Sequence, residues 1–159
     1  MSRYSMRVSW ERQNAKFTDN RYSRAHTWHF DGGVTVPASS SPHVVPIPYS
    51  EPANVDPEEA YVAALASCHM LWFLSIAAKS RFTVDRYDDE AMGVMENNEA
   101  GRLAVNRVTL SPHVTFSGDK TPTDPDVEAM HQQAHESCFL ANSVRTIVQT
   151  QGTWAMQAS

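Results

Sequence analysis

The two cysteines, Cys68 and Cys138, are the residues best suited to chemistry in this sequence, because a thiolate is both a nucleophile and a redox group. They lie 70 positions apart, and the N-terminal residues lack the apolar core of a secretory signal. We therefore expect a soluble, cytoplasmic protein, in which cysteines serve chemistry more often than structural crosslinks. A lone cysteine among alanines in a helix is usually an inert packing residue, so the pair needs further support.

Glu58 precedes Cys68 by ten residues, which is close to three helical turns. If one helix contains both residues, their side chains point toward roughly the same side of that helix. A carboxylate and a thiol would then share one groove.

The second cysteine and two histidines before it have the spacing of metal ligands. His131, His135 and Cys138 stand at positions i, i+4 and i+7, and Cys68 or His69 could complete a set of four nitrogen and sulfur ligands. This pattern predicts a zinc site as the main alternative to thiol chemistry. Against it, histidines near the C-terminal end of a helix often interact with the helix dipole, and adjacent helical residues project about 100° apart.

Both cysteines lie on predicted helices. The first helix has Asp56 as its cap and Pro57 in its first turn, and it continues to about Ala78. The second begins at about Asp126, after a proline-rich turn, and ends near Cys138. Its apolar face comprises Val127, Met130, Ala134 and Cys138.

The first helix is apolar on all sides. Only Ser67, His69 and Ser75 interrupt residues 60–78, and these 19 residues approach the roughly 20 that span a bilayer. The internal polar side chains and the lack of aromatic anchors at both ends instead favour a helix buried in protein. We therefore expect no membrane span.

The remaining apolar residues alternate with polar ones, as in half-buried β-strands. A tight turn at Asp31-Gly32-Gly33 predicts a hairpin, and a long surface loop with six prolines follows from Pro37 to Pro57. Strands are expected at residues 4–10, 24–30, 34–36, 84–95, 103–116 and 146–156, the fourth and fifth joined near residues 97–101.

The composition limits the possible functions. The chain has 159 residues, 42% of them apolar, and one domain covering residues 1–159 is expected at this length. Its formal net charge is -5 and its basic residues are scattered, so we expect no nucleic-acid partner.

Two segments carry a family resemblance. Residues 56–68 read Asp-Pro-Glu-Glu-Ala-Tyr-Val-Ala-Ala-Leu-Ala-Ser-Cys, and residues 134–143 read Ala-His-Glu-Ser-Cys-Phe-Leu-Ala-Asn-Ser. The first is similar to the Asn/Asp-Pro-Glu-Glu helix of the OsmC/Ohr family, which ends in a buried cysteine, and the second to that family's Ala-His-x-x-Cys-x-Ile/Leu-x-Asn-Ser segment. The resemblance implies an α+β, OsmC-like fold, with β-sheet wrapped around the long central helices of an intertwined homodimer.

The resemblance also implies an activity. In this family the first cysteine, matched by Cys68, attacks a hydroperoxide and becomes a sulfenic acid, and the second, matched by Cys138, condenses with it to a disulfide. A dithiol such as a lipoyl group then reduces the disulfide. This implies a peroxidase of organic hydroperoxides without a metal or other cofactor. The family's glutamate, matched by Glu58, and an arginine from another part of the dimer hold each other and bias the first cysteine toward its thiolate.

The sequence departs from the better-known branches of the family in two places. A histidine follows Cys68 where an aromatic residue is common, and the loop before the first helix contains no arginine. The guanidinium must therefore come from elsewhere. Arg24 is our candidate because it begins a strand that leads to the loop, with Arg21 and Arg12 as competitors. Two other functions stay open, a zinc-binding protein and a protein whose dimer groove binds an apolar small molecule without peroxidase activity.

Overall fold

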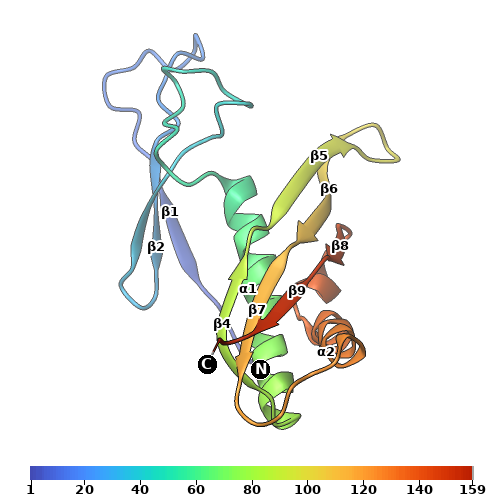
Figure 1. Ribbon diagram of the computed structural model, residues 1–159. Helices are drawn as coiled ribbons and strands as arrows, with labels where there is room; N and C mark the ends of the chain where they lie inside the picture. Colours follow the sequence, from blue (N-terminus) through green and yellow to red (C-terminus); the bar gives the residue numbers. More distant parts are fainter. Residues whose placement is uncertain (159) are drawn as a thin grey trace. The chain divides into compact units, whose positions relative to one another are not determined.

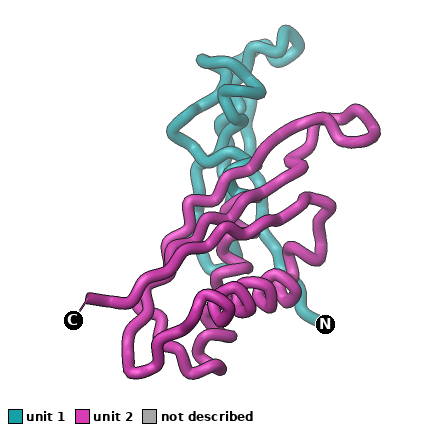
Figure 2. The backbone as a smooth tube through the Cα atoms, turned by 45° about the vertical axis from the view of Figure 1, so that its right-hand side comes forward, with its two compact units in different colours: residues 1–60 teal, residues 61–159 magenta. Residues whose placement is uncertain are grey.

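A computed structural model describes residues 1–158 of the chain. They form two compact units, residues 1–60 and the described residues from 61 onward (Figure 2). The elements are a mixture of helices and strands in the predicted order, so the fold class is α+β. The expectation of a single domain over residues 1–159 stays a prediction.

The first unit is built on an antiparallel sheet with the strand order β1-β2-β3. Its strands lie within or close to the predicted ranges: β1 spans Met6–Ser9, β2 His26–Phe30 and β3 Thr35–Ala38. Gly33, with a φ of 89°, turns β2 into β3 in a conformation that favours glycine. The predicted proline-rich loop follows, and Val55 fixes its end by hydrogen bonds to the backbone of Pro37 and Ser39.

α1 spans Pro57–Lys79, as predicted. Its first turn is capped reciprocally, because the Glu59 amide donates to the Asp56 carboxylate at 2.8 Å and the Asp56 amide donates to the Glu59 carboxylate at 3.2 Å. Within residues 1–158, α1 is the one helix long and apolar enough to span a membrane, a test that core helices of globular proteins also pass. Its buried residues are Leu65, His69, Phe73, Ile76 and Ala77.

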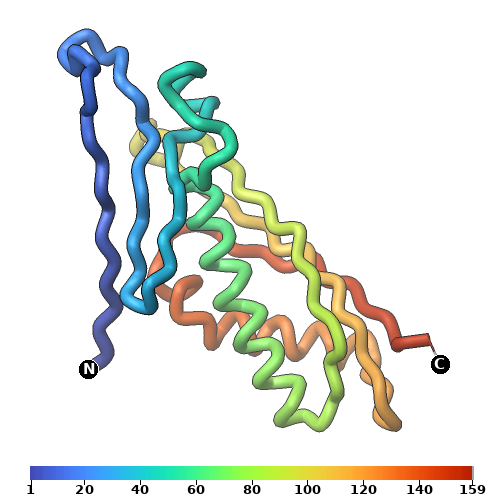
Figure 3. The backbone as a smooth tube through the Cα atoms, turned by 90° about the vertical axis from the view of Figure 1, so that its left-hand side faces the viewer, coloured from blue at the N-terminus to red at the C-terminus, as the bar shows by residue number. Residues whose placement is uncertain are grey.

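After α1 the chain turns back and runs beside the helix as β4 and β5 (Figure 3). The strands of this unit are β4 Thr83–Asp89, β5 Met92–Asn97, β6 Leu103–Leu110, β7 Pro112–Ser117, β8 Ile147–Thr150 and β9 Thr153–Met156. They form two three-stranded sheets, with the orders β4-β7-β9 and β5-β6-β8 (Figure 1). α2, at Asp124–Ser137, connects β7 to the last two strands and begins with a capping box formed by Thr123 and Asp126.

The prediction of three long strands after α1 was wrong, because each of them breaks in two. Pro112 has no amide hydrogen, and the amide of Ser111 donates to the Asp89 carboxylate at 2.6 Å instead of continuing a ladder. At the same level the amide of Gln151 donates to the carbonyl of Leu110 at 2.8 Å, and Gly152 lies between β8 and β9. The three breaks lie side by side, so the first and second parts of the predicted long strands belong to two separate sheets.

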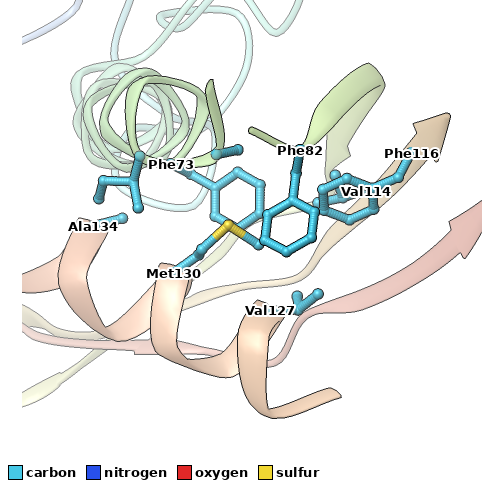
Figure 4. Packing of buried hydrophobic residues seen from close by; sticks show 9 residues of the cluster. Phe73, Phe82, Val114, Phe116, Val127, Met130 and Ala134 are labelled. Atoms are coloured by element: carbon cyan, nitrogen blue, oxygen red, sulfur yellow. The ribbon is translucent and has the colours of Figure 1, made fainter. Parts of the chain in front are cut away.

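Two apolar cores pack α1 against both of these sheets. The larger core joins α1, α2 and the sheet β4-β7-β9, and its residues include Phe73, Phe82, Val114, Phe116, Val127, Met130 and Ala134 (Figure 4). The smaller one joins α1 to the sheet β5-β6-β8 through Leu65, Val108 and Leu110. Each fully buried side chain of this size contributes about 1.5–3 kcal/mol to stability. The predicted apolar face of α2 is confirmed, since Val127, Met130, Ala134 and Cys138 are all buried.

Candidate functional site

The structure brings the two cysteines together. Cys68 lies in the middle of α1 and Cys138 caps the C-terminal end of α2, and their sulfur atoms are 2.6 Å apart. Both cysteines are free thiols. Cys138 is only 2% exposed, whereas Cys68 is partly exposed. Two residues 70 positions apart in sequence therefore form one thiol pair with an inner and an outer member.

Local hydrogen bonds hold Cys138 at the end of its helix. The helix stops because Cys138 has an extended backbone, with φ −67° and ψ 113°. A 3₁₀ turn at Ala141–Ser143 follows, and the amide of Ala141 donates to the Cys138 sulfur at 3.4 Å. The side-chain amide of Asn142 donates to the carbonyl of Glu136 at 2.9 Å, which satisfies one of the free carbonyls at the helix end. The sequence Cys-Phe-Leu-Ala-Asn-Ser thus builds the cap that presents the sulfur.

The surroundings of Cys138 favour its protonated thiol form. Burial, and next the hydrogen bond to Cys68, raise the pKa of Cys138. Cys138 therefore keeps its proton near neutral pH and donates it toward the sulfur of Cys68. Cys68, the outer and partly exposed sulfur, is the one that a substrate can reach.

Apolar side chains lie next to the thiols. Trp72 follows Cys68 by one helical turn, and its ring meets that of Phe139 edge to face at 5.4 Å between centroids. Phe139 directly follows Cys138 and is 69% exposed. Leu71 and Leu140 are also exposed. The surface beside the thiol pair can therefore contact an apolar ligand.

A pair of buried histidines also connects α1 to α2. The Nε2 atom of His69 and the Nδ1 atom of His131 are 3.0 Å apart, and the two rings stack with an interplanar angle of 13°. Burial is the largest cause that lowers the pKa of each histidine to about 4, and for His69 the charges of His131 and His135 add to it. Both imidazoles are therefore neutral at physiological pH.

Two of the predicted zinc ligands on α2 belong to different pairs, and the third, the partly buried His135, belongs to neither. His131 faces His69, and Cys138 faces Cys68. No group of three or more histidine, cysteine or carboxylate side chains gathers at metal-binding distance anywhere in residues 1–158. The spacing i, i+4, i+7 is thus present on α2, but His131 and Cys138 contact different residues of α1.

Glu58 and Arg24 both belong to the first unit. Glu58 lies in the first turn of α1 and is partly buried. The Arg24 guanidinium donates to the backbone and side-chain oxygens of Asn20 and to the carbonyl of Tyr22, and it stacks 3.8 Å above the Tyr22 ring. The only ion pair within the described chain joins Arg86 to Asp88. The pairing of Glu58 with an arginine stays a prediction.

Arg12 and Arg21, the competing arginines, also lie in the first unit. The Arg12 guanidinium donates to the carbonyl of Ala15 at 2.9 Å, whereas the Arg21 side chain is exposed. The contact that sequence reasoning missed is the one between His69 and His131. Their 62-position separation carries no periodic signal, and His131 was considered only as a candidate ligand in the alternative zinc site.

The sequence between residues 50 and 151 matches the family model of OsmC-like proteins. This segment contains α1, α2 and both cysteines. The chain belongs to the OsmC-like family. No curated protein matches it.

Several solved structures are similar to this OsmC-like chain. An OsmC-like protein of unknown function from Vibrio cholerae is 57% identical, with a TM-score of 0.94 over 96% of this chain and 100% of that one. An organic hydroperoxide resistance protein from Elizabethkingia anophelis is 12% identical, with a TM-score of 0.67 over 99% and 98%. One from Legionella pneumophila, also described as a predicted redox protein, is 13% identical, with a TM-score of 0.64 over 98% of each chain. The last two likenesses show the fold.

Proposed function

We propose that this OsmC-like protein is a thiol-dependent peroxidase that reduces organic hydroperoxides. The observation that carries the proposal is the contact of 2.6 Å between the sulfur of the partly exposed Cys68 and that of the buried, protonated Cys138. Two thiols at this distance can form a disulfide after a small movement, because the bond itself needs about 2.05 Å. Similarity to proteins named for hydroperoxide resistance supports the same assignment.

The reaction follows from the unequal thiols. The Cys68 thiolate attacks the outer oxygen of the hydroperoxide, the O–O bond breaks, and the alcohol leaves with a proton, so that a sulfenic acid forms on Cys68. The Cys138 sulfur then attacks the Cys68 sulfur, and its own proton leaves with the hydroxyl group as water. A dithiol of the lipoyl type reduces the resulting disulfide by exchange and becomes oxidised to its own disulfide.

The neighbourhood of the thiols supports an organic substrate. Phe139 is 69% exposed and meets Trp72 beside the sulfur pair, so an apolar organic group could pack there while its peroxide oxygen reaches Cys68. The roles of Glu58 and Arg24, as a pair that favours the Cys68 thiolate, come from the family resemblance and belong to this proposal.

The proposal includes a homodimer. One side of α1 is exposed and consists of small or apolar residues, namely Ala63, Ala64, Ser67 and Leu71. A second copy of the same helix could cover this side, which explains why α1 lacks a charged face. Sedimentation should show a species near twice the chain mass of 17.8 kDa. A stable monomer at micromolar concentration would contradict this part of the proposal. A cytoplasmic location stays a prediction.

The decisive experiment is a thiol titration before and after one equivalent of cumene hydroperoxide. We expect the loss of two thiols per chain and a Cys68–Cys138 disulfide in the peptide masses. The Cys138→Ser variant serves as the matched control, because it should lose one thiol and give a sulfenic acid that dimedone labels. Two thiols that persist in excess peroxide would refute the proposed function and favour the binding-protein alternative.

A further inference from the structure

The buried histidine pair is a second polar contact between the two helices that present the thiols. His69 is 1% exposed and His131 is 7% exposed, so the hydrogen bond between their rings lies out of water. A buried hydrogen bond cannot be replaced by one to solvent when it breaks, which makes its loss costly. The ring of His131 also stacks on Phe73 of α1, at 4.3 Å between centroids.

The chemistry of the pair permits one arrangement of the helices. Two neutral imidazoles share one hydrogen across the 3.0 Å contact, and their outer nitrogens, Nδ1 of His69 and Nε2 of His131, have no partner among residues 1–158. Each neutral imidazole has one donor and one acceptor, but the outer nitrogens lack partners, so the inner contact is the only hydrogen bond of the two side chains within residues 1–158. Sliding or rotating α2 by a fraction of a turn would leave four unsatisfied nitrogens instead of two.

The histidine pair is geometrically coupled to the thiol pair. His69 and Cys68 are consecutive residues of α1, while His131 and Cys138 are separated by seven residues, or about two turns, on one side of α2. Two contacts at different heights along α2 fix both its distance from α1 and its rotation. The histidine contact therefore restricts where the Cys138 sulfur can lie.

Gly152 closes the third side of the pair. A Cβ atom at this position would lie 2.7 Å from Nε2 of His131, and Gly152 lies in the break between β8 and β9. The imidazole is thus confined between Phe73 on α1 and a backbone segment that has no side chain to give way. A bulky group at 152 would push His131 out of its contact with His69.

We propose that the His69–His131 hydrogen bond is a positioning contact that holds Cys138 against Cys68 and raises the effective concentration of the two thiols. The two histidines touch neither sulfur atom in this role and act through the placement of α2. The inference rests on the disulfide step of the proposed function, and it does not depend on which oxidant starts that step.

The test is the equilibrium of the whole protein with reduced and oxidised glutathione. It gives the effective concentration of Cys68 and Cys138 without any peroxide. His131→Phe removes the hydrogen bond and keeps an aromatic ring, so we expect the effective concentration to fall by about tenfold or more. Met130→Ala is the matched control, because it loosens the same helix in the same core and leaves the pair intact. A fall of equal size in both variants, or no fall in His131→Phe, would overturn the proposal.

A conservative double variant distinguishes the hydrogen bond from the ring shape. In His69→Gln/His131→Asn, the side-chain amides can place a donor and an acceptor where Nε2 and Nδ1 now lie. We expect the thiols of this double variant to have most of the effective concentration that is lost when either histidine is replaced by phenylalanine. If the double variant is folded by circular dichroism but its thiols have an effective concentration as low as in His131→Phe, the hydrogen bond is not the positioning element.

Gly152→Ala should disturb the His69–His131 hydrogen bond without replacing either histidine. Its added methyl group should displace His131 and lower the effective concentration of the thiols, whereas Gly32→Ala, with open space around its Cβ position, should change nothing. An unchanged equilibrium in Gly152→Ala would count against the proposal. A wild-type protein that forms the disulfide in glutathione buffer but never consumes peroxide would refute the peroxidase function alone.

Discussion

α1 and α2 meet in two polar pairs of opposite character. The thiol pair is partly exposed and lies where α2 ends, so its chain can move as a bond forms. The imidazole pair is buried, and its His131 ring stacks on Phe73 and lies against Gly152. In the proposed function the two pairs have different roles: the thiol pair reacts, and the imidazole pair keeps the helices in place. Reactivity requires access and freedom to move, and positioning requires burial and a rigid surround.

The largest expected effect comes from breaking the reactive pair. Cys68→Ser should abolish peroxide consumption, because a hydroxyl does not ionise near neutral pH and supplies no comparable nucleophile. Cys138→Ser should allow one fast oxidation per chain and then stop with a sulfenic acid on Cys68. Single-turnover and steady-state assays with the same dithiol separate the two outcomes. Catalytic turnover at the wild-type rate in either variant would show that the assigned roles are wrong.

Glu58→Ala sharpens the comparison by testing the first chemical step apart from helix placement. We expect a severe loss in the rate of peroxide consumption and an unchanged equilibrium with glutathione, because Glu58 lies about three helical turns before His69 on α1. Stability should fall by only about 0.3–1 kcal/mol, the usual contribution of a first-turn glutamate through the helix dipole. Parallel measurements on Arg12→Ala, Arg21→Ala and Arg24→Ala would identify its partner. Unchanged turnover in folded Glu58→Ala removes the residue from the mechanism.

Acid should lower the stability of the folded protein, because its two buried imidazoles bind protons less readily than they do in the unfolded chain. Histidines in the unfolded chain bind protons below about pH 6.5, whereas burial lowers the pKa of His69 and His131 to about 4 in the folded chain. The unfolded state therefore binds more protons between these values, and the free energy of unfolding falls as the pH decreases from about 6.5 to about 4. The limiting slope is about 1.4 kcal/mol per pH unit for each histidine. Urea denaturation across this range measures it.

The double variant His69→Gln/His131→Asn is the control for this pH dependence. It lacks both titrating groups, so its stability should depend less steeply on pH in the same window. Equal slopes for the variant and the wild type would mean that other groups cause the acid sensitivity.

Phe139→Ala should give the smallest effect. Phe139 is largely exposed, so its removal should change stability by no more than about 0.5 kcal/mol. The variant should show a KM for cumene hydroperoxide that is raised several-fold, while hydrogen peroxide, which has no apolar group, should react unchanged. An equal change for both peroxides would argue against an apolar contact with substrate at this residue.

Local patterns in the sequence predicted most of the elements and pointed to the two cysteines that meet in the structure. Asp56 and Pro57 mark the start of α1, and the apolar face of α2 leads to Cys138, because caps and helical periodicity are properties of neighbouring residues. The resemblance of two short segments to the OsmC/Ohr family then predicted that Cys68 and Cys138 act as a pair. The sequence also contained the cause of one strand break, Pro112, but alternation of apolar residues on both sides of it concealed the change of sheet.

Only the tertiary structure decided which distant side chains meet. The spacing of His131, His135 and Cys138 is compatible with a metal site, and nothing local shows that α1 would present His69 to one member and Cys68 to another. The rotation of α2 against α1 depends on the summed packing of the core around Phe73 and Met130. Packing is a property of surfaces that come from separate parts of the chain, so the positioning pair becomes visible only when both helices are in place.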